Sequence, residues 1–427
     1  MSQSLTKAAS AVSDLAENLI GSEIIKIAGE INARIANGED ITNLTIGDFD
    51  PKIYPLPKGL LNEIIQAYED GHTNYPEANG VKVLREAVSG FIRDRQSLHY
   101  GSDDILISGG ARPLIYAAYR ALVNPGEKVV FPVPSWNNNH YTFLSSAEPV
   151  VITTQPENKF LPTAEDIKPH LQDAALVALC SPLNPTGTSF SRSVLAEICD
   201  LIIAENKRRE GQKPLYLLYD QIYCALTLGG TKHYDPVSLR PEMRPYTVYI
   251  DGISKAFAAT GVRVGWAFGP NLVMQKMRSL LSHVGAWSPK PEQIATAKFL
   301  ERHDAVEATI QKHRDMISER VDKLFNGISA LKEVGYPVDA IQAEGAMYLT
   351  VKFDLIGKTT SDGTYLNDAQ DITVFLIKEA KVGMVPFYCF GDSKQSPWFR
   401  VSVGTLRLDS ISMVIENLRE ALGQFKR

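Results

Sequence analysis

The sequence is poor in cysteine and has no long hydrophobic run, and both absences narrow what the chain can be. Its four cysteines among 427 residues include no pair with the Cys-x-x-Cys spacing typical of metal and redox sites. We therefore expect buried thiols in a reducing compartment, without disulfides and without a metal site. No apolar stretch approaches the roughly 20 residues of a membrane-spanning helix, so we expect no membrane partner.

The chain also lacks an excess of basic over acidic residues. The chain has 44 lysines and arginines against 49 acidic residues, a net charge of −5. Proteins that bind nucleic acid usually carry a basic excess, so we expect no nucleic-acid partner. The N-terminal stretch lacks the long apolar segment of a secretory signal peptide, and we therefore expect a cytoplasmic protein.

Seven short β-rich runs alternate with helical patterns between residues 104 and 269. They read DILISG, EKVVFPVP, EPVVITT, AALVALCSP, LYLLYD, TVYIDGIS and VGWAFG. Several are apolar on both faces, as strands buried in a parallel sheet are. We predict an α/β fold whose large domain, residues 53–309, holds a mostly parallel seven-stranded sheet covered by helices.

The rest of the chain predicts a smaller α+β domain made of residues 1–52 and 310–427. Its expected helices cover residues 23–36, 304–334, 369–380 and 409–425, and its expected strands read ITNLTIG, AMYLTVKF and WFRVSVG. The N-terminal segment is assigned here because the large sheet already has its strands.

Polar residues follow the predicted strands at the edge where sheets of this kind bind ligands. They are Gly110, Ala111 and Arg112 after the first run, then Trp136, Asn184, Asp220, Tyr223, Lys255 and Arg263. Each residue alone has an ordinary structural explanation, such as a turn, a helix cap or a solvated charge. Their conjunction at one sheet edge is the informative observation.

The chemistry of this set fits one cofactor. A glycine-rich helix N-terminus and an arginine bind phosphate. An indole can stack on a flat ring, a carboxylate can hold a protonated ring nitrogen, and a phenol and an amide can bind a ring oxygen. A lysine can form a Schiff base with an aldehyde, which completes the binding set for pyridoxal 5′-phosphate. A nicotinamide-dependent dehydrogenase would need a Gly-x-Gly-x-x-Gly turn after an early strand, and the sequence has none.

With this set of residues the sequence resembles the class I/II pyridoxal-phosphate aminotransferases of fold type I, in the branch of the aspartate aminotransferases. The resemblance runs from NLTIGDFDP to WFRVSVGT. Its most specific part is SKAFAATGVRVGWAFGP, which matches S-K-x-x-x-x-x-G-x-R-x-G. Three further motifs are NPTG, D-x-x-Y in YDQIY, and Y-x-x-x-x-G-x-x-x-L-R in YPEANGVKVLR.

The resemblance implies a role for each matched residue. Lys255 is the Schiff-base lysine and Asp220 the partner of the ring nitrogen. The remaining cofactor contacts are Gly110, Ala111, Arg263, Trp136, Asn184 and Tyr223, with Tyr75 reaching the phosphate of a neighbouring subunit. Arg400 grips the substrate α-carboxylate, together with Asn184 and Gly47. A homodimer with shared active sites follows from the role of Tyr75.

The sequence departs from its relatives in two ways. Some relatives have a serine three residues before the lysine, where this chain has Gly252. Dicarboxylate-specific relatives also need a cation for the distal carboxylate, and only Arg112, His283 and Lys290 are candidates. Trp287 lies where relatives line the pocket across the dimer, which favours an apolar or aromatic substrate side chain.

The predicted activity is transfer of an amino group from an L-amino acid to a 2-oxo acid by a ping-pong mechanism, with aspartate and 2-oxoglutarate as one possible pair. Lys255, Asp220 and Tyr223 are the predicted catalytic residues. The alternative is a β-eliminating C–S lyase or a decarboxylase, because the same residues would bind the cofactor. A regulator built on this domain is not expected, because the segment before residue 22 is too short for a DNA-binding extension.

Overall fold

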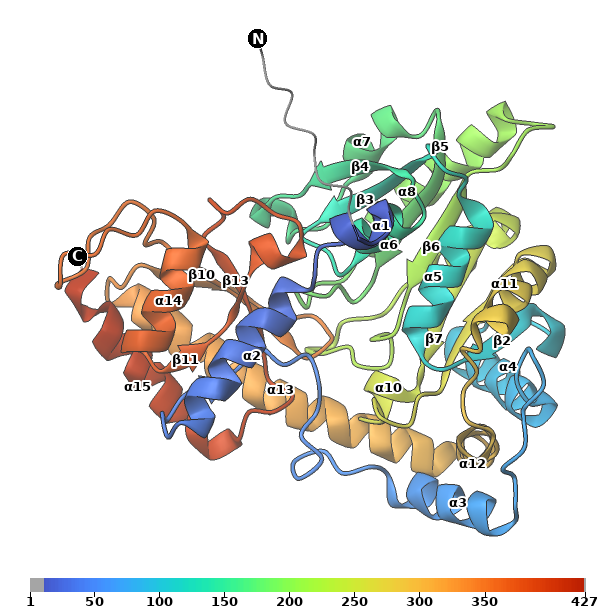
Figure 1. The fold of residues 1–427 in the computed structure, drawn as a ribbon, viewed down its shortest axis with the longest axis horizontal. Coiled ribbons are helices and arrows are strands. Elements are labelled where there is room, and N and C mark those ends of the chain that lie inside the picture. The colour runs from blue at the N-terminus through green and yellow to red at the C-terminus, as the bar shows by residue number, and fades with distance from the viewer. Residues whose placement is uncertain (1–10, 426–427) are drawn as a thin grey trace.

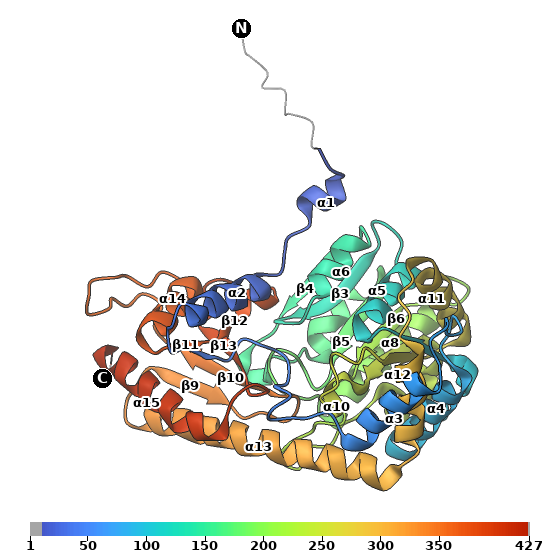
Figure 2. The same ribbon diagram turned by 60° about the horizontal axis from the view of Figure 1, so that its bottom comes forward.

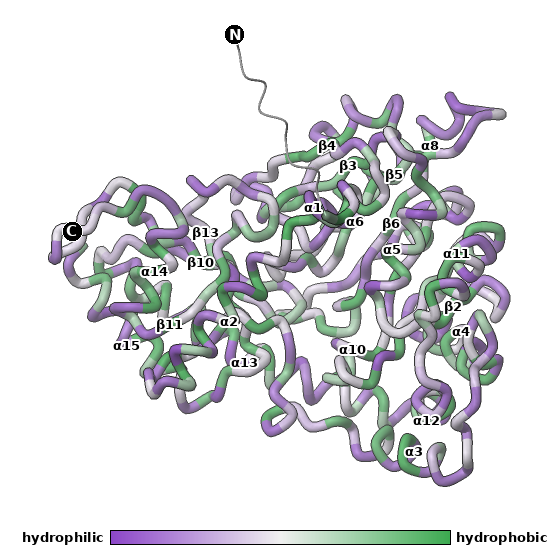
Figure 3. The backbone as a smooth tube through the Cα atoms, in the orientation of Figure 1, coloured by the Kyte–Doolittle hydropathy of each residue, from purple (hydrophilic) through white to green (hydrophobic). Residues whose placement is uncertain are grey.

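The computed structural model describes residues 11–425, which form two lobes with distinct hydrophobic cores (Figure 1). One lobe contains a seven-stranded sheet and the other a four-stranded sheet. Helix α13, His303–Glu333, runs along one side of both lobes (Figure 2). In Figure 3 the hydrophobic segments gather in the interior of the lobes, and hydrophilic segments dominate the outer loops.

The large sheet has the predicted strands and the predicted, mostly parallel, arrangement. Its strands are β2 (Ile105–Ser108), β3 (Lys128–Val133), β4 (Glu148–Thr153), β5 (Ala174–Cys180), β6 (Tyr216–Asp220), β7 (Thr247–Gly252) and β8 (Gly265–Phe268). Their order is β2-β8-β7-β6-β5-β3-β4. Only β8 is antiparallel to its neighbours.

Helices cover both faces of this sheet, which explains why its strands are apolar on both sides. On β5, Val177 and Leu179 belong to one core, and Leu176 and Ala178 belong to the other. The first face is covered by α4 (Lys82–Gln96) and α8 (Arg192–Arg208), and the second by α5 (Ala111–Leu122) and α11 (Asn271–Val284). The other helices outside the small lobe are α1 (Asp14–Asn18), α3 (Lys58–Glu69), α6 (Asn138–Leu144), α7 (Ala164–Ile167), α9 (Pro236–Leu239), α10 (Ile253–Ala256) and α12 (Lys290–Leu300).

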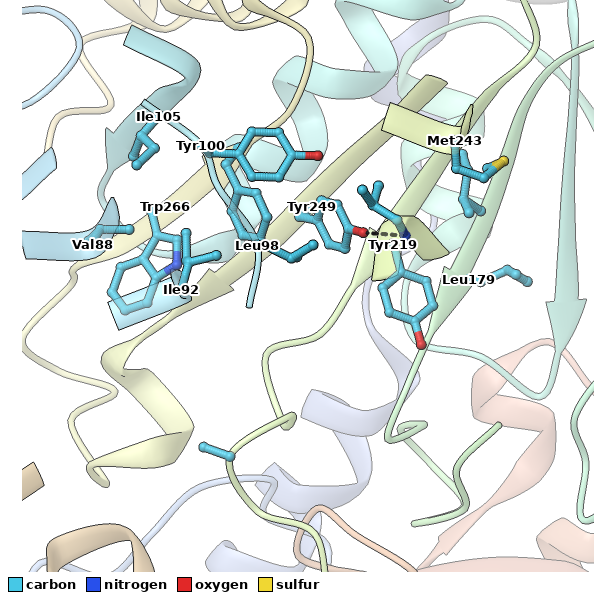
Figure 4. Close-up of a cluster of buried hydrophobic side chains, with 14 of the residues drawn as sticks. Val88, Ile92, Leu98, Tyr100, Ile105, Leu179, Tyr219, Met243, Tyr249 and Trp266 are labelled. Atoms are coloured by element: carbon cyan, nitrogen blue, oxygen red, sulfur yellow. Dashed lines mark hydrogen bonds between the residues drawn. The ribbon is translucent and has the colours of Figure 1, made fainter. Parts of the chain in front are cut away.

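An aromatic cluster fixes β7, the strand that leads to Lys255 (Figure 4). The rings of Tyr249 and Phe268 stack with centroids 4.4 Å apart. The Tyr249 hydroxyl accepts a hydrogen bond from Val237 N–H at 3.0 Å and donates to Asp235 Oδ1 at 2.9 Å. Strand β7 is thereby held by packing and by a satisfied buried polar group.

The small lobe is built on an antiparallel sheet of order β12-β13-β10-β9. Its elements are β9 (Val338–Ile341), β10 (Tyr348–Phe353), α14 (Ala369–Glu379), β11 (Val382–Gly383), β12 (Val385–Pro386), β13 (Trp398–Ser402) and α15 (Ile411–Leu422). Helix α2, Glu23–Ala36, packs on this lobe through Ile31. The Ile31 side chain lies so close to Gly383 that a Cβ atom on Gly383 would collide with it.

The strand predicted over ITNLTIG is much shorter than expected. Only β1, Thr42–Asn43, has strand geometry, and it pairs in parallel with the two residues of β11. Because β11 is so short, the chain beyond Asn43 leaves the sheet and runs to the space between the lobes. This segment, residues 44–50, is called the strap below.

The pairing of β1 with β11 supports the division of the chain that the sequence indicated. We propose a large domain of residues 53–309 and a small domain of residues 1–52 and 310–427, of which residues 1–10 and 426–427 lie outside the described part. Helix α13 is bonded to both, because His313 Nδ1 lies 3.0 Å from Ala256 O and Arg320 Nε donates to Leu406 O at 2.8 Å. Across residues 11–425, every helix is too short or too polar to cross a bilayer.

Candidate active site

A cavity of about 590 Å³ lies between the lobes, at the carboxyl ends of the strands of the large sheet. The structure brings nine of the eleven predicted site residues to its wall: Gly47, Ala111, Trp136, Asn184, Asp220, Tyr223, Lys255, Arg263 and Arg400. Gly110 lies directly behind this wall, and Tyr75 lies outside it.

Lys255 reaches the cavity from the short helix α10, which directly follows β7. Its Nζ donates a hydrogen bond to Gly47 O of the strap at 2.7 Å. Burial lowers the pKa of this amine to about 8, an effect that Asp48 opposes and Arg400 reinforces. A substantial fraction of the amine is therefore uncharged at mildly alkaline pH, as a nucleophile or a general base requires.

Arg263 and the start of helix α5 form an anion-binding corner. The Arg263 guanidinium donates to Thr260 O and Gly109 O, both at 2.7 Å. A Cβ atom on Gly110, where φ is +98°, would lie 2.3 Å from Arg263 Nη2, so only glycine lets the guanidinium approach the helix N-terminus. Arg263 itself has a left-handed φ of 62°, a backbone conformation that is uncommon for residues other than glycine and is often found at functional sites.

Asp220, at the end of β6, and Trp136, in the loop that follows β3, face the same space. Burial raises the pKa of Asp220 to about 6, and its carboxylate accepts a hydrogen bond from Ile222 N–H at 3.1 Å. A buried carboxylate with so few donors favours a cationic partner. The Trp136 ring offers a flat surface, over which the Arg112 guanidinium carbon lies 4.7 Å from the ring centroid.

Arg400 is buried in strand β13, with 2% of its surface exposed. Its Nη1 donates to Asn184 Oδ1 at 3.0 Å and its Nη2 to Thr45 O at 2.6 Å, whereas Nε has no partner among residues 11–425. The rings of Tyr348 and Phe390 lie 4.7 and 4.9 Å from the guanidinium carbon. A buried guanidinium that meets only neutral acceptors is poised to bind a carboxylate.

The strap passes close to Tyr348 and Arg400 at Gly47. A Cβ atom on Gly47 would lie 3.0 Å from Tyr348 Oη and 3.5 Å from Arg400 Nη1. A larger residue would therefore crowd the Tyr348 hydroxyl and narrow the space beside the guanidinium.

Tyr75 and Trp287 lie on the outer surface, away from this chain's own cavity. Tyr75 is 83% exposed, and its ring stands edge-on to Trp287 with centroids 5.4 Å apart. Neither residue lines the cavity.

Gly252, where some relatives have serine, has no space for a side chain. A Cβ atom there would lie 2.9 Å from both Gly265 Cα and Val264 O. Strands β7 and β8 are therefore packed together too closely for the serine hydroxyl that those relatives use.

Of the three cations considered for a distal carboxylate, only Arg112 lines the cavity. His283 lies in α11, away from the cavity wall. The Lys290 ammonium donates to Asn74 Oδ1 at 2.8 Å on the surface.

Asp48 and Tyr348 are among the polar residues of the cavity wall that sequence reasoning missed. Asp48 directly follows Gly47, and its Oδ1 accepts a hydrogen bond from Thr260 Oγ1 at 2.7 Å. Tyr348 begins β10, and its hydroxyl lies 2.7 Å from that of Tyr223. Adjacency to a matched glycine was a usable signal for Asp48, whereas Tyr348 requires the strand register.

The residues present fit pyridoxal 5′-phosphate. The corner formed by Arg263 and the N-terminus of α5 suits a phosphate, Trp136 suits a ring, and Asp220 suits a protonated ring nitrogen. Lys255 suits an aldehyde carbon. The unpartnered Nε of Arg400 is a buried donor on the opposite side of the cavity, where an amino acid's carboxylate would lie.

Comparisons with known proteins agree with this geometry. The family description "Aminotransferase class I and II" matches residues 39–418. An aspartate aminotransferase of Pinus pinaster is 30% identical over 90% of this chain and 75% of its own length. A probable aspartate/prephenate aminotransferase of Rickettsia bellii is 28% identical over 86% of this chain and 88% of its own length. The crystal structure of the aspartate aminotransferase from Rhizobium meliloti superposes with a TM-score of 0.88, at 24% identity, over 97% of this chain and all of that chain.

Proposed function

This chain belongs to the class I and II aminotransferases, and on that premise we propose that its amino donor is aspartate. It is a pyridoxal 5′-phosphate-dependent transaminase of the aspartate aminotransferase type. The lyase and decarboxylase alternatives are not favoured, because the matched relatives named here are transaminases.

The choice of aspartate as the amino donor rests on a second cation in the cavity. Aspartate has two carboxylates, and Arg400 serves one of them. Arg112 lines the same cavity, and no acidic partner is recorded for it within the described residues. Its guanidinium rests on the Trp136 ring, a contact that holds it in place without neutralising its charge.

We assign the other roles from the same geometry. When bound, pyridoxal phosphate supplies an aldehyde carbon and a ring that withdraws electrons. Gly110, Ala111 and Arg263 would hold its phosphate and Trp136 would stack on its ring. Asp220 would bind the ring nitrogen, and Tyr223 and Asn184 would bind the hydroxyl oxygen attached to the ring. These contacts orient the ring relative to Lys255.

Three side chains act directly on the amino acid. Arg400 and Asn184 orient the α-carboxylate, so that the Cα–H bond faces the Lys255 amine. Lys255 Nζ removes the Cα proton and later delivers it, and a pKa of about 8 suits this exchange near neutral pH. Closure of the lobes around the substrate would exclude water from the reacting atoms.

We also propose a homodimer located in the cytoplasm. Helix α3 has an exposed apolar stripe on its outer face. It is formed by Leu61, Ile65 and Tyr68, which lie at helical spacing. Together with the exposed Tyr75 it suits a second copy of this chain, whose cavity Tyr75 would then complete. The four free cysteines suit a reducing compartment. Ile65→Asp should shift the mass measured by light scattering from dimer to monomer, and cell fractionation would test the location.

The test of the proposed donor is an absorption spectrum of the cofactor-loaded enzyme, recorded before and after addition of single amino acids without a 2-oxo acid. Aspartate should bleach the visible band and release one oxaloacetate per site. The Lys255→Ala variant should lack the covalent band, while the surface variant Lys352→Ala should keep it. Release of pyruvate with ammonia, or of carbon dioxide, would instead indicate a lyase or a decarboxylase.

The role of Arg112 needs its own comparison. Arg112→Ala should raise KM for aspartate by roughly 10- to 100-fold and leave KM for an apolar donor such as phenylalanine nearly unchanged. An equal loss with both donors would mean that Arg112 serves the cofactor phosphate instead.

A further inference from the structure

Tyr348 stands where the two lobes meet and touches a functional group of each. It is the first residue of β10, and the register pairs Thr350 of that strand with Arg400 of β13. Tyr348 and Thr350 share one face of the strand, so Tyr348 is a diagonal neighbour of Arg400 on the same face of the sheet. This placement puts its ring 4.7 Å from the guanidinium carbon.

The hydroxyl of the same side chain points across to the large lobe. It lies 2.7 Å from the hydroxyl of Tyr223, and both residues are buried. The two rings meet edge-on, with centroids 5.7 Å apart. Tyr223 follows strand β6, so this hydrogen bond joins the small lobe to the loop that comes directly after Asp220.

We propose that Tyr348 is a positioning residue that connects the carboxylate-binding guanidinium of Arg400 to the phenol of Tyr223. The inference rests on the roles proposed above for those two residues. Its ring, together with that of Phe390, packs against the guanidinium and restricts its orientation. Its hydroxyl sets which way the Tyr223 proton points.

The direction of the hydrogen bond between Tyr348 and Tyr223 follows from the number of protons that each phenol can donate. A phenol has one proton to donate and lone pairs to accept. If Tyr223 donates to the ring oxygen of the cofactor, it can only accept from Tyr348, and the Tyr348 proton must point toward Tyr223. A donor that itself accepts a hydrogen bond is polarised and donates more strongly. Tyr348 therefore strengthens the hydrogen bond that Tyr223 offers.

The charged groups around this pair are few. Arg400 faces both hydroxyls, Asp48 faces Tyr348 from the strap, and the Lys255 ammonium lies 5.9 Å from the centroid of the Tyr223 ring. The Cys180 thiol is close to both phenols, and burial raises its pKa well above its usual value, so it stays neutral.

The test compares Tyr348→Phe, which keeps the ring, with Tyr348→Leu, which loses it. In the cofactor-loaded enzyme, Tyr348→Phe should move the pH midpoint of the visible band upward by roughly half a unit or more, because the ring oxyanion is less well stabilised. Its kcat should fall roughly three- to tenfold, with KM nearly unchanged. Tyr348→Leu should show the same shift and also weaken binding of succinate, an unreactive dicarboxylate, by roughly fivefold or more.

Two further variants separate the possible failures. Tyr223→Phe should shift the band in the same direction and by more, and adding Tyr348→Phe to it should shift the band no further. Tyr100→Phe, which removes a buried hydroxyl without a partner, should leave the midpoint unchanged. A shift with Tyr223→Phe but none with Tyr348→Phe overturns this inference alone. No shift with either variant overturns the proposed role of Tyr223 as well.

Discussion

The arginines at the two ends of the cavity are held in different ways. Arg263 comes from a turn of the large lobe, and both of its hydrogen bonds go to backbone carbonyls of that lobe, Thr260 O and Gly109 O. Arg400 comes from a strand of the small lobe, and its hydrogen bonds go to Asn184 of the large lobe and Thr45 of the strap. The cofactor end is therefore pre-organised within one lobe, whereas the substrate end is assembled across both.

This difference between the two ends of the cavity suits the order in which the cofactor and the substrate bind. A cofactor that remains through the whole cycle benefits from a rigid site, because little ordering accompanies its binding. A substrate that must enter and leave benefits from a site that is complete only when the lobes are correctly placed. Variants at either end of the cavity would test this contrast.

Arg400→Leu should have the largest effect. It removes a buried bidentate partner for the carboxylate, and kcat/KM for aspartate should fall about 1000-fold or more. Steady-state kinetics would measure this, with cofactor affinity followed by equilibrium titration. The contrast between the two ends predicts that cofactor affinity stays within about twofold, and a parallel loss of both would contradict it.

Arg263→Leu is the matched change at the other end. It should weaken cofactor binding by roughly 10- to 100-fold, the usual range for one hydrogen-bonded charged group. KM for aspartate, measured with saturating cofactor, should change little. A large change in KM at saturating cofactor would show that the two ends are not independent.

Gly252→Ser tests how tightly the large-lobe edge is packed. The new Cβ atom would meet Gly265 Cα and Val264 O at 2.9 Å, so the free energy of unfolding should fall by roughly 1–3 kcal/mol. Urea unfolding of the cofactor-free protein measures it, and Gly29→Ser, where no atom lies within 4 Å, is the control. Equal free energies of unfolding for the two variants would mean that β7 and β8 can move apart without loss of stability.

The smallest effect concerns Lys255, which belongs to the large lobe but bonds to the strap. Its pKa is about 8 in the folded chain, against 10.5 for an ordinary lysine. The unfolded chain therefore binds more protons between these values, and the stability of the cofactor-free protein should rise with pH across that window, by roughly 1–3 kcal/mol. Subtracting the pH profile of Lys255→Met isolates this contribution, and a difference that stays flat from pH 8 to 10.5 would contradict it.

The sequence predicted the large lobe well because its signals are local. Each strand of the seven-stranded sheet is a short apolar run, and the polar residues that follow it are brought together by the parallel arrangement alone. Asp220 and Lys255 could therefore be placed at one edge before any contact was known. The roles assigned to these residues stay predictions.

The sequence was less informative wherever a contact depends on pairing between distant segments. The extent of β1 depends on the length of its partner β11, more than 300 residues away. The approach of Tyr348 to Arg400 depends on the register of β10 and β13, and its bond to Tyr223 depends on the placement of the lobes. The lack of space at Gly252 depends on the distance between β7 and β8. None of these leaves a periodic trace in the sequence.

Helix α13 has a mechanical consequence for the contrast between the lobes. His313 ties it to the large lobe at Ala256, and about two turns later Arg320 ties it to the small lobe at Leu406. If the lobes rotate when the amino acid binds, we expect the helix to bend over the few residues between these two anchors.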